Sequence, residues 1–384
     1  MYSYDFNFPG IQISRGPSYT WAQHLKRIPL QGFRLPTLRR IFQSRHAPVD
    51  RPYIDKKIYL YATSIFHTLL ADLEKKRYAR QISEISVASP PVFILGHWRN
   101  GTTFLHNLMC QDTRFTYMRA YQALFPECFL LSPLSQIVSR THHLVPVKTR
   151  PMDNVKFGML EPWEDEFIMA AATGISPYIR ALFPRTLGPE SGYRYPDFVD
   201  TKEITQWKTV FVRLMKRLTI LENKTVLLKS PPHTARIKIL LELFPQSKFI
   251  HIARHPLAVF ASNIKLWSSA LSLAFLQEIG SREIMEMVLS TYVQMYAAYH
   301  EQKALIPEAN LVEITYEDLE KNPVSELRSV YDRLDLPYSP AFEANLKHHL
   351  ETLSTYKKNS FDLSTHVQDM VRNRWADTFD RYGY

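Results

Sequence analysis

Cysteine is scarce in this 384-residue chain, which contains only Cys110 and Cys128. Two cysteines are too few for a disulfide framework or a zinc site, so we expect both to be buried thiols in a reducing compartment. No apolar run approaches about 18 residues, and a membrane-spanning helix is therefore not expected. The first residues lack a basic segment followed by an apolar one, so no secretory signal is evident. These absences predict a cytoplasmic protein.

The chain also lacks internal repeats, low-complexity tracts and clusters of residues with metal-ligand spacing, so no metal site is predicted. Its formal net charge of +10 indicates an anionic partner. A nucleotide, a nucleic acid or an anionic membrane surface would each satisfy that charge. No nucleic-acid-binding module is recognisable, so nucleic acid is the least favoured of the three.

Residues 33–51 combine basic and apolar side chains. An amphipathic segment of this kind either lies on a bilayer or packs its apolar side on the protein core, and we favour packing on the core. Peripheral membrane contact stays open as the alternative. The basic residues are Arg34, Arg39, Arg40, Arg45 and Arg51, and the apolar ones are Phe33, Leu35, Leu38, Ile41 and Phe42.

The most informative segment is P-V-F-I-L-G-H-W-R-N-G-T-T-F-L at residues 91–105. A short apolar run leads through Gly96 and Gly101 into a predicted helix, whose free N–H groups and dipole favour a phosphate. The glycine spacing matches the G-x-x-x-x-G-K-[ST] phosphate loop, but Thr102 stands where that loop needs lysine. Arg99 supplies the cation instead. The segment therefore predicts a phosphate site of a different kind from that of triphosphatases, with a plain glycine turn as the alternative.

Two further apolar strands end in cations. Residues 248–253 precede Arg254, a helix then begins at Pro256, and Ser262 lies eight residues after Arg254. This arginine and serine predict a second phosphate clamp. Residues 226–228 lead to Lys229 in the same way.

Strands and helices alternate along the chain, which predicts an α/β fold with a parallel sheet flanked by helices on both faces. The expected strands are 92–95, 225–229, 248–253 and 311–315, and the expected helices are 102–111, 233–243 and 256–267. Arg99, Lys229 and Arg254 all follow carboxyl ends of strands, where such sheets bind ligands. We expect residues 1–85 to form an N-terminal helical extension, with a helix at 53–80. Residues 86–384 would form the α/β domain, interrupted by an aromatic-rich insertion at 112–220.

Taken together, the motifs G-x-x-R-x-G-T-T-x-L, L-L-K-S-P-x-H and R-x-P-x-x-x-x-x-S resemble those of the sulfotransferase family. Residues 312–319 (V-E-I-T-Y-E-D-L), Asn322-Pro323 and the tail around 356–359 are also typical of that family. The resemblance covers about residues 90–384. It is strongest to the bacterial branch related to tyrosylprotein and Golgi-type enzymes, because Arg99 stands where cytosolic members carry lysine. It implies a P-loop-like α/β fold and the donor 3′-phosphoadenosine-5′-phosphosulfate.

Carried onto these positions, the resemblance implies a division of labour. Arg99 and Lys229 would neutralise charge on the leaving phosphate, while Arg254 and Ser262 would hold the 3′-phosphate. The family reaction needs no metal. The remaining expected donor contacts are Asn100, Gly101, Thr102, Thr103 and Phe104 in the loop and Lys357 and Lys358 in the tail.

The catalytic base is open among three residues. Cytosolic members use a histidine two places after the strand-end lysine, but Pro231 stands there and His233 lies two places further on. Golgi-type relatives use a glutamate, and Glu164 and Glu166 lie in the acidic segment 161–167. We favour Glu164 or Glu166 over His233.

Two other histidines flank the loop: we expect His97 to contact the acceptor and His106 to lie on a helix surface.

The acceptor is the least defined partner. Long insertions often build binding sites, so we expect residues 112–220 to form the acceptor pocket. The aromatic content favours a lipid, a sterol or another hydrophobic alcohol, with a glycan hydroxyl as the alternative. A P-loop kinase or phosphotransferase is less favoured, as is an inactive nucleotide fold that serves as an interaction module.

Overall fold

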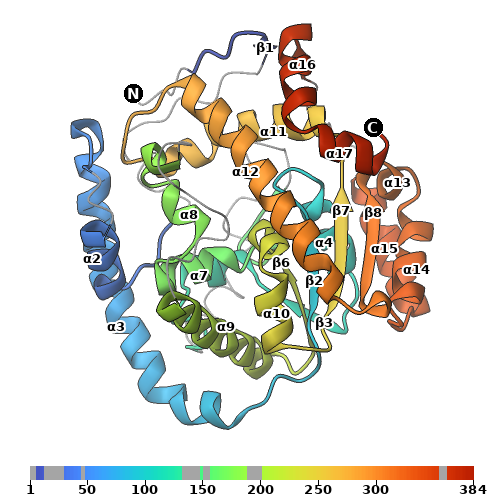
Figure 1. Cartoon of the computed structure of the whole chain (residues 1–384). Coiled ribbons are helices and arrows are strands. Elements are labelled where there is room, and N and C mark those ends of the chain that lie inside the picture. Colours follow the sequence, from blue (N-terminus) through green and yellow to red (C-terminus); the bar gives the residue numbers. More distant parts are fainter. Residues whose placement is uncertain are drawn as a thin grey trace.

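The computed structural model describes residues 6–12, 30–44, 48–131, 148–149, 156–187, 201–353 and 361–384. Its centre is a five-stranded parallel sheet with the order β3-β6-β2-β7-β8 (Figure 1). The strands are β2 (Val92–Leu95), β3 (Phe115–Tyr117), β6 (Thr225–Lys229), β7 (Lys248–Ala253) and β8 (Leu311–Thr315). The predicted α/β fold with a helix-flanked parallel sheet is confirmed, and so are the bounds of its four predicted strands.

Strand β2 is wholly buried because it lies at the middle of the sheet. Its side chains alternate between two hydrophobic clusters, as the pleat requires: Phe93 enters one and Ile94 the other. Phe93 stacks on Phe249 of β7, with ring centroids 5.5 Å apart. Both faces of the sheet are therefore covered, which explains why the strands are continuous apolar runs.

Helices cover both faces of this sheet. The predicted helix at 102–111 is α4 (Thr102–Met109), and the one at 256–267 is α11 (Pro256–Ser269). The one predicted from residue 233 is split into the 3-10 turn η5 (Pro231–Ala235) and α10 (Ile237–Leu243). Further helical elements are η6 (Leu271–Ala274), α12 (Ser281–Gln302), η7 (Lys303–Leu305), η8 (Glu308–Asn310), α13 (Tyr316–Lys321), α14 (Pro323–Arg333), α15 (Pro340–Thr352), α16 (Thr365–Arg374) and α17 (Ala376–Tyr382).

One helical stretch, Pro256–Ala274, is long and apolar enough to cross a membrane. However, 83% of it is buried inside the folded chain. The stretch, which comprises α11 and η6, is therefore mostly a buried part of the core. Cys110 and Cys128 are both buried and free, as predicted.

The N-terminal part lies along one side of the molecule. It comprises α2 (Leu35–Ser44), η1 (Arg51–Tyr53) and the 31-residue α3 (Ile54–Glu84). Leu38 and Ile41 of α2 are buried in the main core, so packing on the core, the favoured interpretation, is confirmed for this helix. A short pair, β1 (Ile11–Gln12) with β9 (Asp362–Leu363), joins the two ends of the chain.

Residues 112–220 are mainly helical but also supply β3, which extends the sheet beside β6. This edge strand was not predicted, because three residues are too few to show the alternating pattern of a strand. The other elements of this stretch are α5 (Ala120–Leu124), the pair β4 (Lys148–Thr149) and β5 (Lys156–Phe157), α7 (Glu166–Thr173), α8 (Pro177–Arg180), η3 (Pro184–Leu187) and α9 (Thr201–Leu221).

Candidate active site

The loop between β2 and α4 turns tightly under the carboxyl end of the sheet. Gly96 has a φ of +146°, and a Cβ there would lie 2.7 Å from the carbonyl oxygen of Ile252. Gly101 has a φ of +94°, and its Cβ would lie 2.3 Å from the ring of Tyr316. Neither position admits a larger residue without displacement of its neighbours. The loop thus brings its backbone to the start of α4, as an anion site requires.

Arg99 joins the first predicted phosphate site to the second. Its backbone is left-handed, with a φ of +73°, and its Nε donates a 2.8 Å hydrogen bond to Oγ of Ser262. Nη1 of Arg254 donates to the carbonyl oxygen of Arg99 at 3.1 Å. The guanidinium of Arg254 also lies 4.3 Å from the centre of the Tyr316 ring. Arg99, Arg254 and Ser262 therefore form one cluster, on the side expected for the 3′-phosphate.

Lys229 lies at the end of β6 and points to the same loop. Its side chain is only 2% exposed, and Nζ donates a 3.3 Å hydrogen bond to Oγ1 of Thr103. Nζ also forms an ion pair with Oε1 of Glu164. The second carboxylate oxygen of Glu164 accepts a hydrogen bond from the hydroxyl of Tyr178, and that hydroxyl accepts a 2.9 Å bond from Nε1 of Trp98. A carboxylate, an ammonium and a phenol thus meet beside the loop between β2 and α4.

Asp165, the neighbour of Glu164, anchors this segment to the residues that follow β6. Its Oδ1 accepts a 2.7 Å hydrogen bond from Ser230, and its Oδ2 accepts a 2.8 Å bond from Nε2 of His233. Burial by itself would raise the pKa of Asp165, but His233 and Ser230 hold that pKa below its usual value. Because Ser230 follows Lys229, these bonds hold Glu164 against the end of β6.

Glu166 and His233, both candidates for the base, are enclosed in the core with 0% exposure. The carboxylate of Glu166 accepts two hydrogen bonds from Arg236, at 2.6 and 3.1 Å. His233 packs edge-on against Phe93 and Phe211, with centroids 5.5 and 5.6 Å apart. Of the three candidates, Glu164 alone pairs with Lys229, and its side chain is 15% exposed.

Comparison with known proteins decides the family. The sulfotransferase family profile matches residues 90–340, which is well over half of the chain. The chain belongs to the sulfotransferase family. It is therefore an enzyme of the class that uses 3′-phosphoadenosine-5′-phosphosulfate, as the motifs predicted.

Two mycobacterial relatives, from Mycobacterium bovis and Mycobacterium tuberculosis, are named omega-hydroxy-beta-dihydromenaquinone-9 sulfotransferase Stf3. Each is 36% identical to this sulfotransferase over 325 residues, which is 84% of this chain and 82% of the relative. Among solved structures, sulfotransferase STF9 from Mycobacterium avium has a TM-score of 0.68 at 16% identity, over 90% of this chain and 95% of that one. STF1 from Mycobacterium tuberculosis has a TM-score of 0.64 at 17% identity, over 89% and 90%. These structures share the fold of this sulfotransferase.

The other predicted loop residues have mixed surroundings in this sulfotransferase. The side chain of Asn100 is buried and donates to the Ile252 carbonyl at 3.0 Å and to the Tyr296 hydroxyl at 2.8 Å, so it braces the loop. Thr102 is also buried, at the first position of α4. Phe104 lies edge-on to Tyr316, with centroids 6.1 Å apart. Lys357 and Lys358 lie outside the described residues.

The prediction for His106 was wrong: it is buried, 6.0 Å from the Tyr117 ring, instead of lying on a helix surface. The side of α4 that carries His106 faces Leu227 of β6 as well as Tyr117 of β3. His97 is also buried, and Nδ1 hydrogen-bonds the Trp98 carbonyl at 3.0 Å. Burial lowers the pKa of each histidine to about 3, so both are neutral at pH 7.

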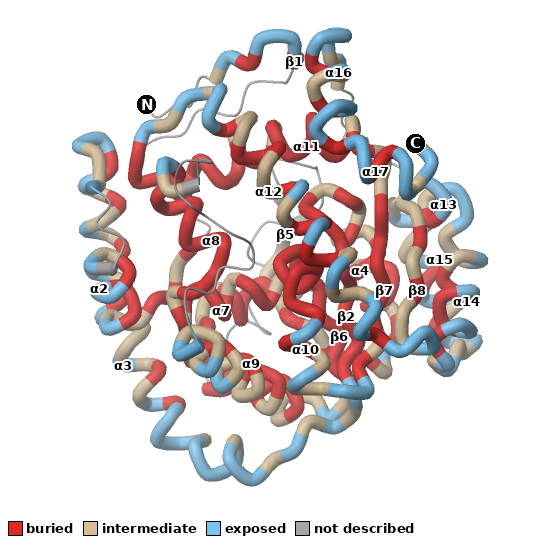
Figure 2. Tube along the Cα trace, in the orientation of Figure 1, coloured by how far each residue is buried: buried red, intermediate tan, exposed pale blue. Residues whose placement is uncertain are grey.

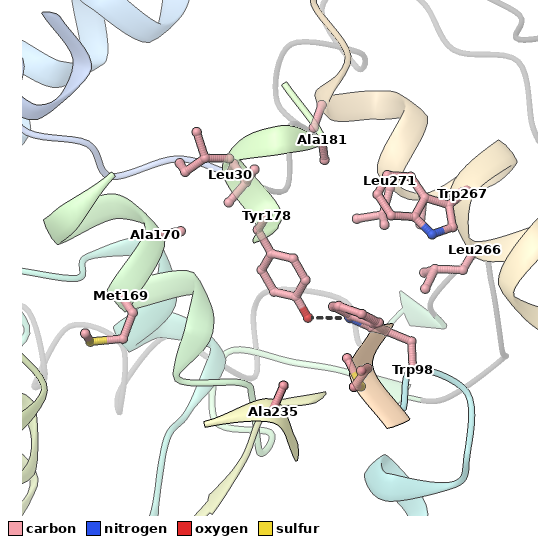
Figure 3. Close-up of a cluster of buried hydrophobic side chains, with 14 of the residues drawn as sticks. Leu30, Trp98, Met169, Ala170, Tyr178, Ala181, Ala235, Leu266, Trp267 and Leu271 are labelled. Atoms are coloured by element: carbon pink, nitrogen blue, oxygen red, sulfur yellow. Dashed lines mark hydrogen bonds between the residues drawn. The ribbon is translucent and has the colours of Figure 1, made fainter. Parts of the chain in front are cut away.

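Tyr178 belongs to a cluster of buried hydrophobic side chains, within which its hydroxyl meets Nε1 of Trp98 (Figure 3). Phe167 lies 4.9 Å from the Tyr178 ring, and Trp98 lies 6.0 Å from it. Trp98 was not singled out from the sequence, and no local signal distinguishes it from an ordinary loop aromatic. The same apolar cluster includes Leu30, Met169, Ala170, Ala181, Leu266, Trp267 and Leu271.

Proposed function

We propose that this sulfotransferase moves a sulfuryl group from 3′-phosphoadenosine-5′-phosphosulfate to the hydroxyl of a lipid or another hydrophobic alcohol. The observation that carries the proposal is the position of Glu164. Its carboxylate lies between the cation at the end of β6 and a phenol inside an apolar cluster. We assign the donor to the side of Lys229 and the acceptor hydroxyl to the side of Tyr178.

The residues present suit this donor. The loop at 96–103 and the start of α4 offer backbone N–H groups to the 5′-phosphate. The cluster of Arg99, Arg254 and Ser262 offers two cations and a hydroxyl to the 3′-phosphate. With Arg99 engaged there, Lys229 is the cation left beside Thr103 for the leaving phosphate.

In the proposed step, Glu164 removes the proton from the acceptor hydroxyl. The acceptor oxygen then forms a bond to sulfur while the bond from sulfur to the 5′-phosphate oxygen breaks, and the bisphosphate departs with the bonding pair. Lys229 stabilises the charge that develops on the departing oxygen. Lys229 must therefore leave Glu164 for the phosphate when the donor binds, which frees the carboxylate to act as the base.

Glu166 and His233 do not suit this role because both are enclosed. Proton transfer needs the base within hydrogen-bond distance of the acceptor, either directly or through one water. Glu166 already accepts two hydrogen bonds from Arg236, and His233 is already hydrogen-bonded to Asp165. We assign these two residues to positioning the segment that carries Glu164.

The apolar surroundings of Tyr178 support a hydrophobic acceptor, and the names of the two curated relatives specify a menaquinone lipid for those proteins. A glycan would require polar partners for several hydroxyls, whereas the Tyr178 ring packs against Phe167 and Trp98 within the hydrophobic core. We therefore rank the glycan second and a kinase reaction third.

Two measurements test the proposal. The purified protein should be stabilised against heat by adenosine 3′,5′-bisphosphate but much less by ATP with Mg²⁺. With ³⁵S-labelled donor, label should transfer to an omega-hydroxylated isoprenoid or a long-chain alcohol in preference to sugars. Transfer to sugars alone would establish the glycan alternative, and stabilisation by ATP without transfer would indicate a kinase.

A further inference from the structure

Helix α3 carries a long apolar stripe on the outside of the molecule. Of the eight large hydrophobic side chains that are exposed in the described residues, six belong to this helix. At 100° per residue they fall within an arc of about 120°, and they extend over about 28 Å. The six are Ile54, Ile58, Ile65, Phe66, Leu69 and Leu73, each between 47% and 66% exposed.

The opposite side of α3 is firmly attached to the protein. Nζ of Lys56 is buried and donates 2.9 Å hydrogen bonds to the carbonyl oxygens of Leu273 and Phe275. Glu74, also buried, pairs with Arg217 and accepts a 2.7 Å bond from the N–H of Leu130. The helix therefore cannot roll to bury its outer stripe, which stays exposed at the edge of the molecule (Figure 2).

Positive charge marks the ends of the stripe. Exposed Arg51 precedes α3, and the exposed residues Lys75, Lys76, Arg77 and Arg80 follow Leu73. The acids of α3 are each bonded within the protein, Glu84 to Arg80 of the basic end itself. Asp55 accepts from the backbone N–H of Lys56, and the other three pair with arginines: Asp72 with Arg34, Glu74 with Arg217 and Glu84 with Arg80. The outer face is thus apolar along its length and basic at its ends.

We propose that the outer stripe of α3 docks on an anionic lipid bilayer, with its apolar side chains at the headgroup boundary and its basic residues on the headgroups. A helix that lies in the interface has this combination of an apolar face and flanking lysine and arginine. Anionic lipid also complements a chain whose formal net charge is +10.

A second copy of the chain would match this face less well. Two α3 helices related by a two-fold axis run either antiparallel or parallel. In the first case the basic end after Leu73 would meet Arg51 of the other copy, and in the second each basic end would meet its own equivalent. Like charges would then face each other at both ends of the contact. The lipid headgroup has the opposite charge and meets no such repulsion.

The inner side of α3, opposite the stripe, is attached near the proposed acceptor side. Lys56 ties α3 to the stretch that contains η6, and Leu271 of η6 belongs to the apolar cluster around Tyr178 (Figure 3). A lipid alcohol in a docked bilayer would therefore lie close to that cluster. This last link rests on the proposed function, whereas the docking itself does not.

The test is sedimentation of the full chain with vesicles of phosphatidylcholine alone and with 30% phosphatidylglycerol. We expect binding to the anionic vesicles that weakens with salt. The double substitution Ile58→Ser with Leu69→Ser should lower the binding constant about tenfold or more. The matched control is Leu305→Ser, which alters a side chain 53% exposed in η7, away from the stripe, and should not change binding.

Absence of binding to anionic vesicles, or equal losses in the double variant and the control, would overturn the proposal. So would a dimer in sedimentation equilibrium that the double variant dissociates, because the stripe would then belong to a second copy. Thermal stabilisation by adenosine 3′,5′-bisphosphate should be the same in all these variants. A protein that fails that measurement contradicts the proposed function, whatever its behaviour with vesicles.

Discussion

Glu164→Gln changes one charge at the centre of the proposed site and little of its shape. The carboxylate now accepts from both Lys229 and Tyr178, whereas an amide offers one accepting oxygen and one donating nitrogen. One of the two contacts must be lost or reversed, which should cost about 1–3 kcal/mol of folding stability. The larger effect is chemical, because an amide cannot take the acceptor's proton. We expect turnover to fall about 10²–10⁴-fold.

The assay for this variant is turnover of labelled donor at saturating donor and acceptor, with calorimetry of bisphosphate binding alongside. Bisphosphate binding should not weaken, because the substitution removes a negative charge near the phosphates and releases Lys229. Turnover within about tenfold of the wild type would refute Glu164 as the base.

Glu166→Gln is the matched control, since it makes the same change two residues away. It leaves the buried Arg236 without its carboxylate, so it should cost about 3–5 kcal/mol of stability, measured by urea unfolding. The fraction that stays folded should retain far more turnover than Glu164→Gln. His233→Asn should likewise lower stability more than turnover, because its partner is the buried Asp165. If His233→Asn abolished turnover in folded protein while Glu164→Gln did not, the histidine would be the base.

Three further outcomes are expected. Lys229→Ala should reduce turnover much more than bisphosphate affinity, since its interaction with the departing oxygen strengthens in the transition state; equal losses would make it a binding residue only. Arg254→Ala should weaken bisphosphate binding by about 1.5–3 kcal/mol in calorimetry and leave the weak binding of ATP unchanged. The pKa values of His97, His106 and His251 are each lowered by burial to about 3, against about 6.5 in the unfolded chain. The unfolded state therefore binds more protons below pH 6.5, and each histidine should reduce the free energy of unfolding by about 1.4 kcal/mol per pH unit as the pH falls from 6 to 4, measured by urea unfolding; no dependence on pH would contradict the neutral buried state.

The strands of the sheet were predictable because each is an apolar run with a distinct end. Each of these apolar runs ends at or just before a distinctive residue, namely Gly96, Lys229 or Arg254. The sequence alone therefore indicated which edge of the sheet would carry the candidate site. Strand β3 was missed because three residues carry no measurable period. The error at His106 has another origin: this side of α4 packs on β6 as well as on β3, and burial by residues distant in the sequence leaves no local signal.

The carboxylate proposed as the base could be narrowed from the sequence to a short acidic segment but not to a single residue. Glu164 and Glu166 have similar neighbours along the chain, and their different surroundings come from partners 65 and 70 residues away, Lys229 and Arg236. No pattern among neighbouring residues indicates a contact between residues so far apart in the sequence. The linking role of Asp165 was equally hidden, because it depends on Ser230 and His233.

The hydrogen bond between Asp165 and Ser230 lies at a boundary in the chain: Glu164 precedes it, and the apolar residues of α7 and α8 follow it. Glu164 is held to β6 by the bonds of its immediate neighbour and by Lys229, while Tyr178 of α8 donates to its second oxygen. Substitutions at Phe167 or Met169 remove none of these bonds, so under the proposed function they would alter which alcohol fits. Acceptor preference would then be open to redesign in α7 while the groups proposed for sulfuryl transfer stay in place.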